Sequence, residues 1–152
     1  MGGMEFYMGD KYFCIFAISL PNSSIAFGTL QINQEANTTG NSPGPIVVQN
    51  DGNAFVNINL SSSALWASAP LPSNYYQFSI GNNTGQAGSF NWTGSATSIT
   101  NMSSSDRYAI SYLNYSSATH TARTDVYVQV PPNEPPAFRN STITFKAILG
   151  ET

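Results

Sequence analysis

The sequence predicts an all-β protein, and three observations lead to this prediction. Apolar and polar residues alternate with the period of a strand in several stretches, whereas the helical period is almost absent. Turn residues separate these stretches. The chain has 152 residues, which is enough for one domain with a real core. Together these features predict an immunoglobulin-like β-sandwich of about seven antiparallel strands, preceded by an extended N-terminal strand.

The first element is the apolar segment Tyr12–Leu20, in which both the odd and the even positions are apolar. A strand made from it has two apolar faces, and both need cover. We therefore divide the chain into an N-terminal extension, residues 1–20, and a β-sandwich domain, residues 21–152. The segment is shorter than the roughly 18 apolar residues of a membrane span. A cleaved leader is a less favoured alternative, because Glu5 and Asp10 precede the segment where a leader is basic.

Seven strands are predicted after Pro21. In order they are Ile25–Leu30, Ile46–Gln49, Ala54–Leu60, Tyr75–Ile80, Tyr108–Leu113, Thr124–Val130 and Ser141–Leu149. Alternation in three of them predicts which side chains face the core. These are Val56, Ile58 and Leu60, then Val126, Val128 and Val130, and finally Ile143, Phe145, Ala147 and Leu149.

Four connections have their own signals. The Asp-Gly pair within Gln49–Asn53 predicts a tight hairpin turn. Ser61–Ala69 could form one helical turn with a serine as its N-cap. Gln31–Gly44 is a long polar loop, of a kind that is usually functional or mobile. Pro131–Pro136 reads PPNEPP and predicts a stiff, extended spacer.

Few residues are charged, only 9% of the chain against roughly 25% in an average soluble domain. The formal net charge is −3. No basic stripe is available to neutralise phosphates, so a nucleic-acid partner is not expected. Cys14 is the only cysteine, and its apolar surroundings predict a buried free thiol.

Asn-x-Ser/Thr triplets are the motif that rises above background. Eight occur, about twice the number that the composition predicts by chance. They begin at Asn22, Asn37, Asn59, Asn82, Asn91, Asn101, Asn114 and Asn140. All are predicted in loops, at strand starts or on a polar strand face, where a sugar could be carried, so we expect N-linked glycans. The alternative is a polar surface with incidental triplets.

Catalytic and metal-binding patterns are weak. His120 is the only histidine, and we expect it on the surface and not in a triad with Asp125. No nucleophile-elbow motif is present, and no pair of carboxylates has the spacing of a glycosidase. The Asn50–Asn53 stretch resembles a turn more than a calcium loop. We therefore expect no enzyme activity, no cofactor and no metal site.

The larger aromatic side chains admit two readings. Trp66, Tyr75, Tyr76 and Trp92 could form a platform on which sugars stack. Trp66, however, is expected to cover one end of the core, and Trp92 lies inside the Asn91 triplet, where it could pack against its own glycan.

A family resemblance covers roughly Ile25–Leu149. The succession IAFGTL, PIVVQNDGNAFVNINL, VYVQVPPNEPP and STITFKAIL resembles secreted β-sandwich domains of archaeal surface proteins, which include glycosylated, thread-like filament subunits. The resemblance implies an extracellular location at the cell surface. It brings no catalytic residues with it.

The resemblance also implies a use for the apolar N-terminal segment. In donor-strand filaments, one subunit leaves a groove between sheet edges and the terminal strand of the next subunit fills it. The expected product is a homopolymer of identical subunits. The donor residues would be Phe13, Ile15, Phe16, Ile18 and Leu20. Equally open is that this segment is the first strand of its own sandwich, in a non-filamentous surface-layer domain or a glycan-binding adhesin module.

Overall fold

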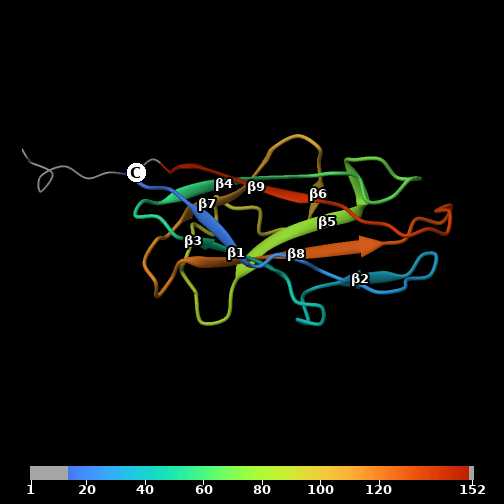
Figure 1. The fold of residues 1–152 in the computed structure, drawn as a ribbon, viewed down its shortest axis with the longest axis horizontal. Coiled ribbons are helices and arrows are strands. Elements are labelled where there is room, and N and C mark those ends of the chain that lie inside the picture. Colours follow the sequence, from blue (N-terminus) through green and yellow to red (C-terminus); the bar gives the residue numbers. More distant parts are fainter. Residues whose placement is uncertain (1–13, 151–152) are drawn as a thin grey trace, which may run out of the picture.

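Two antiparallel β-sheets face each other in the structure, a computed structural model that describes residues 14–150 (Figure 1). No helix occurs among these residues. The prediction of an all-β fold is therefore confirmed, and the arrangement is that of a β-sandwich.

The larger sheet has six strands. Its order is β1 (Ile18–Asn22), β3 (Ile46–Asn50), β8 (Thr121–Gln129), β5 (Ser73–Asn82) and β6 (Thr100–Met102), with β2 (Glu35–Asn37) also paired to β8. The smaller sheet has the order β7 (Arg107–Leu113), β4 (Val56–Ser62) and β9 (Ile143–Leu149). β9 therefore pairs with β4 along one side only.

Six of the seven strands predicted after Pro21 are present, some with shifted ends. The prediction of a strand at Ile25–Leu30 is wrong, because the main chain of these residues has no ladder partner in the described part of the chain and Gly28 turns it with a φ of 74°. The short strands β2 and β6 were not predicted. Each has only three residues, so neither can show an alternating pattern.

The core confirms the predicted faces of two strands. Val56, Ile58 and Leu60 of β4 are fully buried, and Val126 and Val128 of β8 are buried opposite them. Val130, which follows β8, is buried as well. These residues form one cluster with Trp66, so the expected role of Trp66 in covering the core is confirmed.

β9 differs from the prediction. Its inward-facing residues Ile143, Phe145 and Ala147 are only half-buried, and Leu149 is exposed. The alternation is correct, but the strand lies at the edge of the smaller sheet and, among the described residues, nothing pairs with its outer side. The sandwich is therefore open along β9.

Two predicted local structures are wrong. The turn at Asp51–Asn53 is present, but β3 and β4 belong to different sheets, so it is a corner between layers and not a hairpin. Ser61–Ala69 forms no helical turn. Ser61 and Ser62 continue β4 and pair with Thr144 and Ile143, so the main chain there is extended.

Cys14 is exposed, so the prediction of a buried thiol is wrong. It precedes β1 in the chain.

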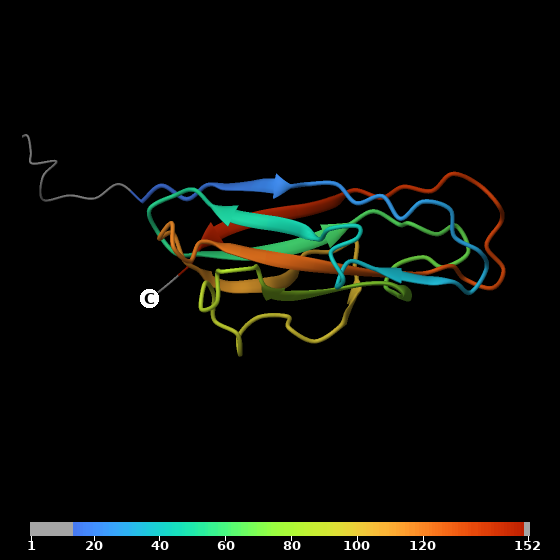
Figure 2. The same cartoon turned by 90° about the horizontal axis from the view of Figure 1, so that it is seen from below.

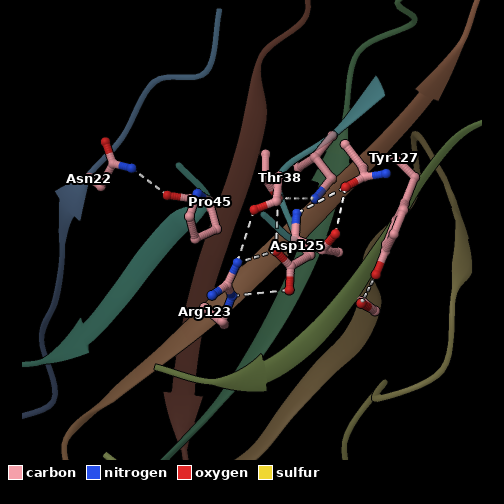
Figure 3. Close-up of polar contacts among 10 residues, drawn as sticks. Asn22, Thr38, Pro45, Arg123, Asp125 and Tyr127 are labelled. Carbon is pink, nitrogen blue, oxygen red and sulfur yellow. Dashed lines mark hydrogen bonds and ion pairs between the residues drawn. The ribbon is translucent and has the colours of Figure 1, made fainter. Parts of the chain in front are cut away.

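A buried polar cluster attaches β2 to β8 (Figure 3). The Asp125 carboxylate accepts a hydrogen bond from Thr38 Oγ1 at 2.8 Å and pairs with Arg123 Nη2 at 2.7 Å. Thr38 Oγ1 in turn accepts from the Val126 N–H at 3.0 Å, and Arg123 donates to the Thr38 carbonyl oxygen. A buried charge is tolerated only when it is paired and hydrogen-bonded in this way.

Candidate functional site

A groove of about 1340 Å³ opens between the two sheets. Its floor is the inner face of the larger sheet, with Ile46, Tyr76 and Val128. Its walls are two segments without regular structure, residues 23–32 and 132–142, and the second leads into β9 at Ile143. Figure 2 shows these walls extending toward the end of the sandwich that lies opposite the start of the described chain.

Both walls offer unpaired main-chain groups. Within residues 14–150, no main-chain hydrogen bond is made by residues 23–30, although the side chains of Ile25, Phe27 and Leu30 pack on the core. The outer edge of β9 is equally unpaired within the described part of the chain. An extended peptide lying between these edges could pair with main chain on both sides.

The second wall is anchored by a buried carboxylate. Glu134 accepts hydrogen bonds from the main-chain N–H groups of Ala67 and Ser68, each at 2.9 Å, and from Ser68 Oγ at 2.5 Å. Arg139 forms an ion pair with the same carboxylate, since its Nε lies 2.7 Å from Glu134 Oε1. The Nε–H group does not point at that oxygen, so the pair includes no hydrogen bond from Nε. Sequence reasoning missed this anchor, whose only signal was a lone Glu inside a proline-rich spacer.

Opposing effects act on the pKa of Glu134. Burial raises it, but the hydrogen bonds from Ser68 and Ala67 and the charge of Arg139 outweigh burial and hold the pKa below its ordinary value. The anchor is therefore a carboxylate at neutral pH, and the wall of the groove depends on that charge.

The predicted donor residues are divided between two environments. Ile18 and Leu20 belong to β1, which pairs with β3 of the same chain, and both are half-buried against the core. Ile15 and Phe16 are exposed, with 57% of the Ile15 surface accessible. Phe13 lies outside the described residues.

Residues 15–17 are held against the corner that follows β3. The Ile15 carbonyl oxygen accepts from the Asn53 N–H, and the Ala17 carbonyl oxygen accepts from the Asp51 N–H, both at 2.8 Å. Gly52 allows this approach, because a Cβ there would lie 2.0 Å from the Ile15 oxygen. The chain is thus fixed to its own sandwich from Ile15 onward.

Four of the eight triplet asparagines are exposed, and their Nδ2 atoms make no hydrogen bond among the described residues. They are Asn37, Asn82, Asn91 and Asn140. The Nδ2 atom is the one that carries an N-linked sugar, so these four present an accessible acceptor atom. Asn140 also lies on the groove wall.

The other four are less accessible. Asn22 donates through Nδ2 to the Pro45 carbonyl oxygen (Figure 3), and Asn114 donates through Nδ2 to Thr119 Oγ1 at 2.9 Å. Asn59 and Asn101 are half-buried on strands.

The four aromatic residues considered as a sugar platform do not share one surface. Trp66 and Tyr76 are buried in the core, and Trp66 Nε1 donates to the Tyr75 carbonyl oxygen at 3.0 Å. Trp92 is exposed and stacks on Phe90, with ring centroids 5.8 Å apart.

The residues considered for catalysis are not brought together. His120 is half-buried and its Nδ1 lies 3.2 Å from the Asn50 carbonyl oxygen, whereas Asp125 is bound by Arg123 and Thr38. Residues 14–150 contain no group of His, Cys, Asp and Glu side chains that could hold a metal ion. Over the same range, no helix is long and apolar enough to cross a membrane.

Comparison with family models, curated proteins and solved structures finds no match to this chain. Function is therefore inferred from the groove, the N-terminal segment and the asparagines themselves.

Proposed function

We propose that the chain is the structural subunit of an extracellular, N-glycosylated filament. Each subunit inserts the N-terminal part of its chain that precedes Ile15 into the groove of the next identical subunit. The protein has no enzymatic role in this proposal. The single observation that carries it is the open groove beside the edge of β9, with which no other strand of the described chain pairs.

Strand topology supports an immunoglobulin-like assignment for the groove. In that fold, strands B, E and D are neighbours in one sheet and strands C, F and G in the other. Here β3, β8 and β5 correspond to B, E and D, and the pair β4 and β9 corresponds to C and F. The position of strand G, on the outer side of β9, is unfilled among the described residues. We infer that a neighbouring subunit fills it.

The geometry suits head-to-tail assembly. The described chain begins at one end of the sandwich, and the groove walls lie toward the other end (Figure 2). A segment leaving one subunit therefore points at the groove of the next. Head-to-tail contacts of this kind do not close on themselves, so they propagate into fibres.

The energetics also favour a filled groove. Fully burying a large apolar side chain contributes about 1.5–3 kcal/mol. Completing the burial of half-buried residues such as Ile143 and Phe145 would contribute roughly half of that for each. Covering β9 would also remove an exposed sheet edge, which otherwise invites uncontrolled association.

Glycans on the exposed asparagines would agree with an extracellular location and would hydrate the surface of the protein. Only 9% of the residues are charged, so little of the surface is hydrated by ionic groups. Sugars on Asn37, Asn82 and Asn91 would add bulky, solubilising groups to it.

The test is assembly of the full chain with and without residues 1–13. The full chain should form filaments visible by negative-stain electron microscopy, whereas the truncated chain should stay folded and monomeric, because it keeps β1, its pairing with β3 and the hydrogen bonds of Ile15 and Ala17. Filaments from the truncated chain, or only monomers from the glycosylated full chain at high concentration, would contradict the proposal.

One observation favours a second candidate, a non-filamentous surface-layer domain. β1 pairs with β3 of its own chain, as expected for a first strand that stays in its own sandwich. In that case the native material should form sheets or monomers, and the same micrographs decide between the two candidates.

A further inference from the structure

We propose that Met4–Met8 of a second copy is the strand that pairs with the outer edge of β9, reached through the groove past Ile143, and that it runs antiparallel to β9 with Glu5 opposite Lys146. This proposal rests on the proposed function and specifies which segment is donated, in which direction and in which register.

The donated segment must lie upstream of Ile15. The hydrogen bonds of Ile15 and Ala17 to Asn53 and Asp51 fix the chain to its own sandwich from there onward. Ile18 and Leu20 pack on the core of the same subunit. Only residues 1–14 can therefore reach another subunit without breaking these contacts.

Within that range, one stretch has the pattern of a half-buried strand. Met4, Phe6 and Met8 alternate with Glu5 and Tyr7. One face is therefore apolar, and the other carries a charge and a phenol. Glycines precede and follow the stretch, which limits the strand to these five residues.

The head-to-tail arrangement fixes the direction. Subunits related along a filament have the same orientation, and the donated segment continues the path of β1 backward into the neighbour. Its chain direction is therefore that of β1, and β1 and β9 run in opposite directions (Figure 2). The donated strand is antiparallel to β9.

Three features set the register. Lys146 points to the outer face of β9 with 63% of its side chain exposed, and opposite charges across neighbouring strands stabilise a pair. Its ammonium group has three donors, so the contact with Asp106 leaves room for Glu5. With Glu5 opposite Lys146, the apolar Met4, Phe6 and Met8 fall opposite the half-buried inward residues of β9, which are Ala147, Phe145 and Ile143 in that order.

The reach of the chain agrees with this register. From Met8 to Cys14 the chain spans about 20 Å when extended, and the same number of residues separates Ile143 from Ala137. Phe13 then falls beside Phe138, whose side chain is 88% exposed at the rim of the groove. The body of the donor subunit starts just outside the rim.

Cysteine cross-linking of the full chain tests the register. In a Cys14→Ser background, Tyr7→Cys and Thr144→Cys should lie directly opposite each other on the outer face. Oxidation of assembled filaments with diamide should give a ladder of covalent multimers that a reductant collapses. Tyr7→Cys with Ile148→Cys is the matched control, since both residues share that face but lie four positions out of register, and it should stay largely monomeric.

Each outcome is decisive. Filaments that form without a 7–144 cross-link would overturn the register while leaving the proposed function intact. An internal cross-link within single chains would show that the strand fills its own groove, and would overturn the second copy as occupant. A chain that forms no filaments under any condition would contradict the proposed function itself.

A charge exchange gives a second measurement that does not need cysteines. Glu5→Lys and Lys146→Glu should each raise the concentration required for assembly several-fold, and the two changes combined should restore most of the loss. Equal effects of the single and double changes would overturn the pairing of Glu5 with Lys146.

Discussion

Gly52 is the residue whose lack of a side chain matters most to the path of the N-terminal segment. It lies at the corner after β3, and the Ile15 carbonyl oxygen occupies the space where a Cβ would be. The corner thus needs a glycine for close approach and not for an unusual φ. This contact binds the described chain to its own sandwich from Ile15 onward.

Gly52→Ala should detach residues 15–17 from the corner. The clash with main-chain atoms should reduce the free energy of unfolding by about 1–3 kcal/mol. The amide protons of Asp51 and Asn53 should then exchange faster with solvent, which hydrogen exchange measures. Gly40→Ala is the control, because no heavy atom lies within 4 Å of a Cβ there. Unchanged exchange at Asn53 in the Gly52 variant would contradict this account.

Glu134 makes the groove wall sensitive to acid. Because its pKa is lower in the folded state, its contribution to stability is present above about pH 4.3, the ordinary pKa of a Glu. That contribution is lost as the pH falls through the lower, folded-state value. The wall should therefore loosen in acid and not in base.

Glu134→Gln should remove this acid-dependent part of the stability. At pH 7 the variant should be destabilised by about 1–3 kcal/mol, since the N–H groups of Ala67 and Ser68 and the charge of Arg139 lose a carboxylate partner. Thermal unfolding at pH 7 and pH 3 should show the gap between wild type and variant shrinking in acid. A gap that stays constant would contradict the role of the charge. Asp106→Asn, in an exposed pair, should cost less than about 1 kcal/mol.

At the scale of elements, β4 and β9 are neighbours with very different burial. Ile58 of β4 is fully buried, whereas Ile143 of β9 is half-buried. The difference follows from position, because β4 is the central strand of its sheet and β9 an edge.

The loss of stability caused by an Ile→Ala substitution should therefore depend on assembly differently in the two strands. Ile58→Ala should cost about 2–5 kcal/mol in monomers. Ile143→Ala should cost roughly half as much in monomers and more in filaments, where the groove is filled. Denaturant unfolding of a truncated monomer and of assembled chains measures both. An Ile143→Ala cost that is the same in the two states would argue that nothing covers β9.

The alternation of apolar and polar residues predicted the long strands, because each of these strands has one face against the core. That reasoning worked for β4 and β8, whose valines and isoleucines are buried where expected. It failed at Ile25–Leu30, where the side chains do pack on the core but the main chain finds no partner strand. The alternation of apolar and polar residues indicates which side chains are buried. Whether a segment pairs as a strand depends on residues that are distant in the chain.

The candidate site was only partly predictable for the same reason. The eight asparagines and the apolar N-terminal segment are visible in the sequence. The groove is not, because its two walls come from segments that lie at least 100 positions apart in the chain, residues 23–32 and 132–142. The anchoring of Glu134 by Ala67 and Ser68 is likewise a contact across 66 or 67 positions, which no local motif marks.

At the scale of the whole molecule, the accessibility of the eight asparagine side chains predicts how fully each of them carries a glycan. Glycopeptide analysis of native protein should find Asn37, Asn82, Asn91 and Asn140 occupied most fully. Asn22 and Asn114 should be occupied least, because their Nδ2 atoms already donate hydrogen bonds. Substituting each of the four exposed asparagines by Gln should lower the mass by one glycan. Native protein with no sugar at any of the eight would contradict the extracellular assignment.

The groove walls and the start of the described chain lie toward opposite ends of the sandwich, and this has a consequence for growth (Figure 2). If subunits join head to tail, the two tips of a filament are chemically different. One tip displays an empty groove, and the other displays a free tail. Chains that lack residues 1–13 offer a groove but no tail, so they should bind only at the tip that displays a free tail and stop elongation there, which means that growth can be arrested from one side.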